Sequence, residues 1–470
     1  MSLPNIIFII TDQQRYDTIA GLGASFMQTP HLDRLVSEGV SFDQCHCTGA
    51  VCVPSRASLF SMEYPHTVRS YTNSSPWQQC WVEDFQKAGY HTINVGKMHT
   101  NPIDGAFGFD QRYIVENKDR ALPYGHPHGG FLDEWDKFML NCGVRKPSRE
   151  TYRIEDPNWS TGLGAFEWPL EEKFHPDTFV GTMAQWAVET READTPLFLQ
   201  IGFPGPHPPY DPPRRFLDLY ENTDIPVSLV TDEELAAQPP YHEAYRSAMM
   251  KGHPDAVKWH ERPSEAQLLR LWKHYAANVT LIDEQVGQIL SSLENNGYLE
   301  DAIVVFMSDH GDCLGDHGHT QKWTMYDAVT RVPAIVWAPG KLPEGKRTNA
   351  LIQHMDLVPL LFELAGVDQP DHSGAQSALP VALGESDGRD AVFAELAGRG
   401  SNAYLNMVRT QDWKLVHYLD HSDFGELYNL NADPSEIHNL WTQPEYDPTK
   451  TELLKILREW HLRQSAIYNC

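Results

Sequence analysis

Two short polar motifs each follow a strand-length apolar run. Asp12 and Gln13 come directly after an isoleucine-rich run, and Asp309 and His310 come directly after a second apolar run. Either pair alone is more typical of a turn or a helix cap. Together, two carboxylates, an amide and an imidazole suit Ca²⁺, Mg²⁺ or Mn²⁺ rather than a three-histidine or cysteine-rich zinc site. If the two runs are parallel strands of one sheet, both pairs lie in one crevice and predict a metal site.

A third motif, Cys-x-Pro-Ser-Arg, occupies residues 52–56. Its Pro54 and Ser55 begin a predicted helix, so residue 52 is expected near a helix N-terminus, where an anion is favoured. The alternative is a buried structural cysteine beside the start of a helix. At average residue usage, the pattern would arise by chance in a chain of this length about once in a thousand sequences.

The chain around these motifs alternates between predicted strands and helices. Apolar runs predict strands over residues 5–11, 40–45, 91–95, 196–203, 302–308 and 333–337. Helices are predicted over residues 31–38, 77–88, 264–293 and 356–364. This alternation predicts an α/β fold with a large, mainly parallel sheet flanked by helices. Functional side chains are then expected beyond the carboxyl ends of the strands.

The C-terminal part of the chain has a different pattern. Residues 366–390 are rich in Gly, Pro, Asp and Ser and are expected to be a linker. Short apolar runs and one helical pattern follow, at residues 391–395, 403–410, 413–417, 426–429 and 449–465. They predict a small antiparallel sheet with a closing helix. We therefore expect a catalytic domain over residues 1–375 and a small C-terminal α+β subdomain over residues 376–470.

Proline argues against regular structure in three other stretches. Residues 204–209, which contain four prolines, are too proline-rich for a helix or a central strand. The stretches 121–171 and 211–263 are rich in Pro and Trp and are expected to be loop insertions that shape the mouth of a pocket.

The composition is that of a globular protein with an acidic surface. The 470 residues carry 37 Lys and Arg against 64 Asp and Glu, and the net charge of −27 disfavours nucleic acid and anionic membranes as partners. An anionic small substrate would need a locally basic pocket. No apolar run is long enough for a transmembrane helix, and no signal-peptide pattern is found, so a cytoplasmic location is expected. The seven scattered cysteines do not resemble a disulfide framework.

Taken in order, the motifs resemble the sulfatase family of the alkaline-phosphatase superfamily over nearly the whole chain. Residues 52–56 match the signature that a formylglycine-generating enzyme reads when it oxidises the cysteine to Cα-formylglycine. Downstream, Ser61–Tyr64 departs from the Thr-Gly-Arg often found there. The other matching segments are residues 5–12, 29–35, 96–99, 108–110, 206–208, 275–293, 309–318, Lys322 and 426–434.

The resemblance implies a set of site residues. One divalent ion, expected to be Ca²⁺ with Mn²⁺ or Mg²⁺ as alternatives, would be bound by Asp12, Gln13, Cys52, Asp309 and His310. Catalytic roles would fall to the formylglycine made from Cys52 and to Arg56, Lys97, His99, His207 and Lys322. Family members commonly carry a second Asp where this chain has Gln13, whereas phosphonate monoester and phosphodiester hydrolases commonly have Gln there.

The implied reaction is hydrolysis of an aryl, alkyl or sugar sulfate ester. One hydroxyl of the hydrated aldehyde at residue 52 would attack sulfur, while Arg56, Lys97 and Lys322 stabilise the equatorial oxygens. His207 or Lys322 would protonate the leaving oxygen. His99 would then take the proton of the second hydroxyl, and the aldehyde would be regenerated as sulfate leaves.

The expected partners are a small anionic ester substrate and, during maturation, the formylglycine-generating enzyme; the sequence leaves oligomer formation open. The first alternative function is a phosphonate monoester or phosphodiester hydrolase that uses the same residues. The second is a non-catalytic binding protein on the same scaffold. Such a protein would be expected to lack Cys52, Arg56, Lys97 or Lys322, and all four are present.

Overall fold

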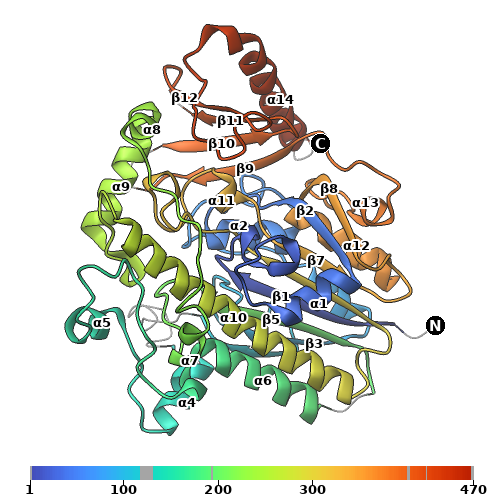
Figure 1. Cartoon of the computed structure of the whole chain (residues 1–470). Helices are drawn as coiled ribbons and strands as arrows, with labels where there is room; N and C mark the ends of the chain where they lie inside the picture. The colour runs from blue at the N-terminus through green and yellow to red at the C-terminus, as the bar shows by residue number, and fades with distance from the viewer. Residues whose placement is uncertain (1–2, 117–130, 192–193, 400–402, 420, 467–470) are drawn as a thin grey trace.

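The computed structural model describes residues 3–116, 131–191, 194–399, 403–419 and 421–466 of the chain (Figure 1). Within these residues, the larger of two sheets has the strand order β4-β3-β5-β1-β6-β7-β2-β8. Its strands are β1 (Asn5–Asp12), β2 (Val40–His46), β3 (His91–Gly96), β4 (Gln111–Ile114), β5 (Leu197–Pro206), β6 (Ala302–Ser308), β7 (Ala334–Trp337) and β8 (Lys346–Gln353). All neighbouring pairs are parallel except those of β7, which confirms the predicted large, mainly parallel sheet.

Helices cover both faces of this sheet because its strands are apolar on both sides. Along β1, Ile7 and Ile9 pack with one group of helices, and Ile6, Phe8 and Ile10 pack with another. The first group contains α1 (Pro30–Glu38), α6 (Pro176–Thr190) and α10 (Glu265–Asn295). The second contains α2 (Cys52–Ser61), α3 (Val82–Lys87) and α12 (Leu357–Ala365).

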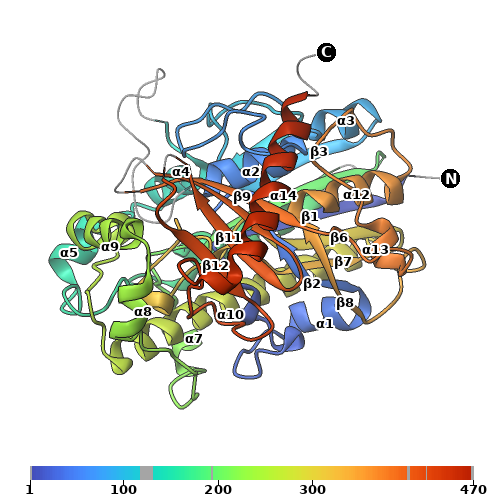
Figure 2. The ribbon, with the colours of Figure 1, turned by 90° about the horizontal axis from the view of Figure 1, so that it is seen from above.

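The smaller sheet and the last helix stand at one end of the molecule. Strands β9 (Val392–Ala397), β10 (Tyr404–Arg409), β11 (Trp413–Tyr418) and β12 (Gly425–Asn429) are antiparallel in sequential order. Helix α14 (Asp447–Ala466) lies across them (Figure 2). The predicted C-terminal antiparallel sheet and closing helix are therefore confirmed. The backbone N–H of Glu395 donates to the carbonyl of Thr48, so β9 is hydrogen-bonded to the main body.

Strand β7 runs against its two neighbours, although the sequence pattern predicted it within a parallel sheet. The reason lies in the connection from β6. Residues 309–333 contain only two short helical turns, η5 (Asp316–Gly318) and α11 (Asp327–Thr330), and no crossover helix that could return the chain to the opposite edge. The chain therefore re-enters the sheet from the edge at which it left.

Strand β5 continues through Pro204 and Pro206, so the prediction that residues 204–209 cannot be central strand was wrong for residues 204–206 and is confirmed for residues 207–209. The missing proline N–H groups are accommodated by an irregularity in the ladder with β1, where Asp12 lies opposite Pro206. The N–H of Gly205 donates instead to Oδ1 of Asp177 at 2.8 Å.

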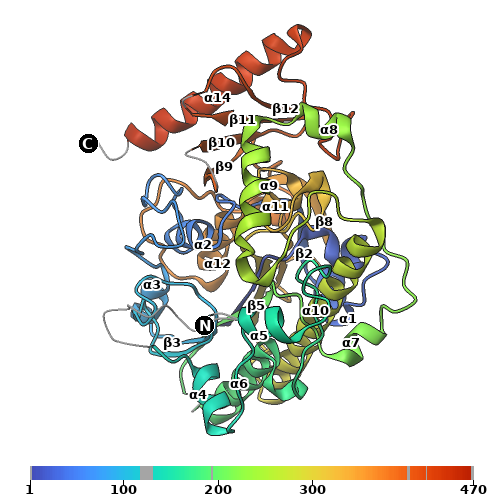
Figure 3. The ribbon, with the colours of Figure 1, turned by 90° about the vertical axis from the view of Figure 1, so that its left-hand side faces the viewer.

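Two other expectations of irregular structure were wrong. The described parts of the stretches 121–171 and 211–263 contain helices α4 (Glu134–Asn141), α5 (Arg149–Glu155), α7 (Arg214–Asp218), α8 (Asp232–Ala237) and α9 (Pro240–Gly252). Local caps start several of them, such as Asp133 at α4 and Ser148 at α5. Figure 3 shows α9 extending toward the small sheet, where His242 lies 3.0 Å from Oε1 of Glu426 in β12.

Two further boundaries differ from prediction. The stretch 366–390, expected to be a linker, contains α13 (Leu379–Leu383), and Lys346 Nζ donates to the carbonyl of Ala382 in that helix. The helix predicted over 77–88 begins only at Val82, because tertiary hydrogen bonds from Trp77 to Asn101 and from Trp81 to Phe60 hold the preceding backbone. No helix among the described residues is long and apolar enough to cross a membrane.

Candidate active site

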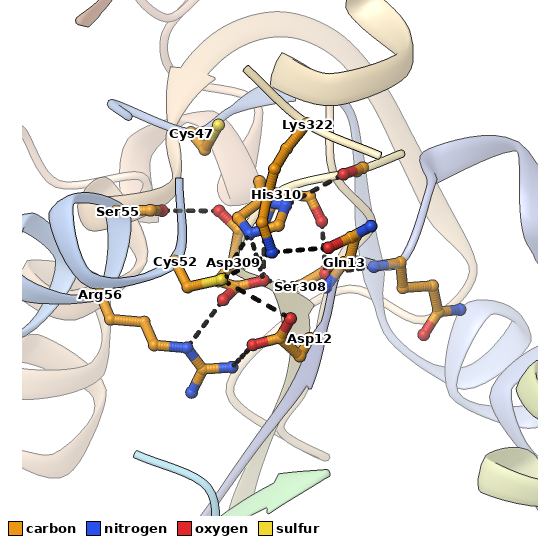
Figure 4. A network of polar contacts seen from close by, with 12 residues as sticks. Asp12, Gln13, Cys47, Cys52, Ser55, Arg56, Ser308, Asp309, His310 and Lys322 are labelled. Carbon is orange, nitrogen blue, oxygen red and sulfur yellow. Dashed lines mark hydrogen bonds and ion pairs between the residues drawn. The ribbon is translucent and has the colours of Figure 1, made fainter. Parts of the chain in front are cut away.

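The two sequence motifs meet at the carboxyl edge of the large sheet. Strands β1 and β6 are parallel neighbours with Thr11 opposite Ser308, so the residues that follow each strand emerge side by side. Helix α2 begins at Cys52 and points its N-terminus into this edge, and Figure 4 shows the three segments converging. The topology thus places the thiol of Cys52 between Asp12 and His310.

Four buried side chains form a cluster of metal-ligand type. Donor atoms of Asp12, Cys52, Asp309 and His310 all lie within 4.8 Å of one another. The Nδ1–H of His310 donates to the carbonyl of Gly311 at 3.0 Å, which turns Nε2 toward Cys52 Sγ at 3.1 Å. Such a backbone partner orients an imidazole for metal binding. Two carboxylates and an oriented imidazole fit a divalent cation.

The predicted ligand Gln13 lies at the same edge. Its backbone has φ 69°, and its N–H donates to Oδ1 of Asp309 at 3.0 Å. Its side-chain oxygen accepts a 2.7 Å hydrogen bond from Nζ of Lys322, which also lies 3.0 Å from Cys52 Sγ. The amide oxygen therefore lies beside Lys322 next to the cluster, and its binding to a metal ion stays a prediction.

Three cationic side chains, Lys97, Arg56 and Lys322, gather at this edge of an acidic protein. Nζ of Lys97 lies 2.8 Å from Oδ2 of Asp12, and Arg56 bridges Asp12 and Asp309 at 3.3 and 2.7 Å. Burial alone would raise the pKa of Asp12, but the charges of Lys97, Lys322 and Arg56 hold it well below its usual value. The Asp12 side chain is therefore held as a carboxylate by the cationic groups around it.

The thiol of Cys52 is fully buried at the start of α2. Burial and the Asp12 carboxylate raise the pKa of this thiol, whereas Lys322 and His310 lower it, and the net shift is downward. The pKa of Lys322 is raised, because the charges of Cys52, Asp12 and Asp255 outweigh the effect of burial. Residue 52 is thus held where a negative charge is stabilised.

Close backbone contact positions Lys97. It follows β3, and its N–H donates to the carbonyl of Gly202 in β5 at 2.7 Å. A Cβ on Gly202 would lie 1.7 Å from the carbonyl oxygen of Lys97, so only glycine allows this approach.

The two predicted catalytic histidines lie on separate loops. The Nδ1–H of buried His207 donates to the carbonyl of Pro208 at 2.8 Å. Burial and the charges of Lys322 and Lys97 lower its pKa well below the usual value, although Asp12 opposes this. His99 has φ 62°, and its backbone N–H donates to Glu116 Oε1 at 3.1 Å. A proton transfer between the ring of His99 and residue 52 stays a prediction.

Three supporting residues were missed as site residues. Ser55 Oγ donates to the carbonyl of Asp309 at 2.6 Å, and Asp312 Oδ2 accepts a hydrogen bond from the Gln13 amide. Both lie inside the sequence motifs, so their proximity could have been inferred. Tyr275 donates from its hydroxyl to the carbonyl of Gln13 at 2.7 Å. It comes from the middle of α10, and no local pattern marks it as part of the site.

Comparison with known proteins supports one family for this arrangement. The sulfatase family model matches residues 4–367, and the model of the C-terminal region of N-sulphoglucosamine sulphohydrolase matches residues 315–463. An arylsulfatase of Clostridium perfringens is 29% identical over 469 residues, covering 97% of this chain and 93% of that protein. An N-acetylglucosamine-6-O-sulfatase of Bacteroides thetaiotaomicron is 27% identical over 515 residues, covering 97% of this chain and 86% of that protein.

The fold is also shared with solved structures. The phosphonate monoester hydrolase of Agrobacterium radiobacter superposes with a TM-score of 0.76 at 21% identity, covering 98% of this chain and 96% of that one. At this identity the likeness concerns the fold. The family match spans most of the chain, including both strand-end motifs and residue 52. The chain with this buried cluster at the carboxyl edge of its sheet therefore belongs to the sulfatase family.

Proposed function

We propose that this protein hydrolyses sulfate esters with a formylglycine derived from Cys52 and one divalent metal ion. The observation that carries the proposal is the position of Cys52 Sγ, 3.1 Å from Nε2 of His310 and 3.0 Å from Nζ of Lys322. A side chain at this point can share a cation with Asp12, Asp309 and His310 and still face an incoming anion. The two relatives compared above carry the names of sulfatases, which supports a sulfate ester as substrate.

Five groups would hold the metal: Asp12, Gln13, residue 52, Asp309 and His310. The bound ion would supply positive charge that lowers the pKa of a hydroxyl on residue 52 and stabilises the oxygens of the ester. Oxygen-rich coordination favours Ca²⁺, with Mn²⁺ or Mg²⁺ as alternatives. The aldehyde at residue 52 would supply, in its hydrated form, two hydroxyls on one carbon.

Arg56 is best described as a positioning residue. Its Nε, Nη1 and Nη2 face Asp309, the carbonyl of Lys97 and Asp12. Because these donors are all directed at protein groups, Arg56 orients the carboxylates and the turn that carries Lys97. Lys97 and Lys322 are the cations whose flexible amines can shift from protein partners to the equatorial oxygens of the ester.

Lys322 is the stronger candidate for proton donation to the leaving oxygen. With the unmodified Cys52 the pKa of Lys322 is raised by Cys52, Asp12 and Asp255, and the last two charges remain beside it after Cys52 is converted. His207 is neutral and uses its Nδ1–H on the carbonyl of Pro208, so its Nε2 is an acceptor. His207 would then accept a hydrogen bond from the substrate or from Lys322. His99 is proposed to take the proton from the second hydroxyl of residue 52.

One residue favours a second function, hydrolysis of phosphonate monoesters or phosphodiesters. Gln13 stands where many sulfatases have a second carboxylate, and it removes one negative charge from the site. A less negative site would suit an ester that keeps more charge on its oxygens. The non-catalytic alternative is disfavoured, since Cys52, Arg56, Lys97 and Lys322 all meet at one edge of the sheet.

The test compares two esters of one phenol, an aryl sulfate and an aryl phosphonate. The protein is co-expressed with a formylglycine-generating enzyme, and mass spectrometry of the peptide ending at Arg56 measures conversion of Cys52. We expect an aldehyde at residue 52, a kcat/KM at least tenfold higher for the sulfate, and no turnover by Cys52→Ala. A preference for the phosphonate would replace the sulfatase assignment, and turnover by Cys52→Ala would refute the nucleophile.

A further inference from the structure

A second group of potential metal ligands lies beneath the small sheet, with no residue in common with the active-site cluster. Donor atoms of His66, Glu395 and His461 all lie within 4.8 Å of one another. These residues come from three distant segments: the loop after α2, strand β9 and helix α14. Figure 2 shows α14 crossing the small sheet in the direction of α2.

Glu395 and His66 are already held face to face. Oε2 of Glu395 lies 2.8 Å from Nδ1 of His66 and accepts the backbone N–H of the same residue at 3.0 Å. The other carboxylate oxygen accepts from Tyr404 at 3.2 Å. Among the described residues, the buried Nε2 of His66 has no hydrogen-bond partner. The contact with Glu395 therefore accounts for Nδ1 of His66 and leaves Nε2 without a hydrogen-bond partner among the described residues.

His461 completes the group from the opposite side. Its ring centroid lies 5.2 Å from that of His66, and its Nε2 lies 2.8 Å from Nδ2 of Asn406. Oδ1 of Asn406 is buried without a partner among the described residues. Exchanging the amide nitrogen and oxygen would let Oδ1 accept an Nε2–H of His461. The Nδ1 lone pair of His461 would then be free for a metal ion, with Asn406 orienting the ring.

The surroundings restrict water without closing the site. Glu395 on β9 lies opposite Asn406 on β10, which in turn lies opposite His417 on β11. Aromatic rings cover the group: Trp460 stacks on Phe393 at 4.5 Å and meets Tyr64 edge-on at 4.9 Å. The His66 side chain is 17% exposed and that of Glu395 is 1% exposed, so an ion can enter beside His66.

We propose that His66, Glu395 and His461 bind a second divalent ion of the zinc class. Two imidazoles and one carboxylate form a donor set that zinc and similar transition metals prefer over calcium, and three protein ligands leave a fourth position for water. The ion would join α14 and β9 to the segment that follows α2. It would stabilise the packing of the C-terminal sheet against the main body, and it takes no part in the ester hydrolysis.

The test measures zinc binding by the full chain in the Cys52→Ala background with excess Ca²⁺, so that the active-site cluster contributes no thiol ligand. Equilibrium dialysis with elemental analysis gives the stoichiometry, and competition with a chromophoric chelator gives the affinity. His461→Ala and Glu395→Gln remove a ligand; His438→Ala changes an exposed histidine and is the matched control. Circular dichroism checks that each variant is folded.

We expect one zinc equivalent in the parent and in His438→Ala, with affinity at least about tenfold weaker in the two ligand variants. Zinc should raise the Tm of the parent and leave that of Glu395→Gln unchanged. X-ray absorption should show nitrogen and oxygen neighbours with imidazole scattering. Equal affinity in His461→Ala and His438→Ala, absence of a retained equivalent, or sulfur in the coordination shell would overturn the proposal.

Discussion

Gln13 donates a 2.5 Å hydrogen bond from Nε2 to Oδ2 of Asp312, and both side chains are fully buried. The same carboxylate oxygen accepts the hydroxyl of Tyr210 at 2.7 Å. These contacts fix which end of the amide is nitrogen, and they turn its oxygen toward Lys322. Asp312 therefore holds the Gln13 amide in the orientation that presents its oxygen to Lys322.

This relationship predicts the outcome of Gln13→Asp. The new carboxylate would face Asp312 without a donor between them, so the free energy of unfolding in chelator should fall by about 1–3 kcal/mol. Calcium should recover part of this loss, because a further carboxylate strengthens the metal site. The double variant Gln13→Asp, Asp312→Asn restores a donor and should be more stable than the single variant. Denaturant unfolding with and without Ca²⁺ measures each effect, and an unchanged stability of Gln13→Asp in chelator would contradict this account.

A proton-donating role for Lys322 predicts a dependence on the leaving group. Lys322→Met keeps the approximate shape but removes the charge, so kcat/KM should fall about 10²–10⁴-fold for an alkyl sulfate. The loss should be at least tenfold smaller for a nitrophenyl sulfate, whose leaving oxygen needs little protonation. Lys455→Met, at an exposed position of α14, is the control. Equal losses for both substrates would assign Lys322 to charge stabilisation instead.

The contact between Gly202 and Lys97 predicts that Gly202→Ala damages the site from a distance. The added methyl group would collide with the carbonyl of Lys97, and β3 and β5 would have to separate. We expect a loss of at least about 2 kcal/mol in stability and a fall in kcat of more than tenfold. Gly252→Ala, whose Cβ would meet only Pro254 Cδ at 3.9 Å, should change neither. Steady-state kinetics measures kcat and denaturant unfolding measures the free energy of unfolding for both variants. Equal values for Gly202→Ala and Gly252→Ala would contradict the prediction.

His274 in α10 predicts a specific loss of stability in acid. Burial and the nearby Arg270 lower its pKa from 6.5 to about 3. The folded state therefore binds fewer protons than the unfolded state between these values, so the stability present above pH 6.5 is lost as the pH falls toward 3. From pH 7 to 4.5, wild type should lose about 2 kcal/mol more than His274→Gln. Equal pH dependence in urea unfolding would show that His274 titrates normally.

The parallel core of the fold could be predicted because local pattern and tertiary position agree there. A strand buried on both faces must be a short continuous apolar run, which is how β1 and β6 were located to within a residue. Strand β7 has the same composition, but its direction depends on which edge the connection from β6 leaves and re-enters. No property of residues 334–337 encodes that.

The active-site residues also divide into those that a local sequence motif predicts and those that it does not. Asp12, Asp309 and Cys52 follow from local motifs, because strand ends and helix starts bring their side chains to an edge of the sheet. Lys97 and Lys322 could be named only through family resemblance, since a lysine in a turn has no local signature of function.

The amino-acid sequence by itself determined the buried central strands, the polar residues that follow β1 and β6, and what chemistry those side chains can perform, but not the edge strands β4 and β8 or the end of β5. Only the tertiary structure decided which of those side chains meet. Gln13 faces Asp312, and His66 meets Glu395 and His461 although more than 300 residues separate it from either of them. The reason is physical: local conformation depends on neighbours along the chain, whereas a hydrogen bond or a metal site depends on distances set by packing of the whole core.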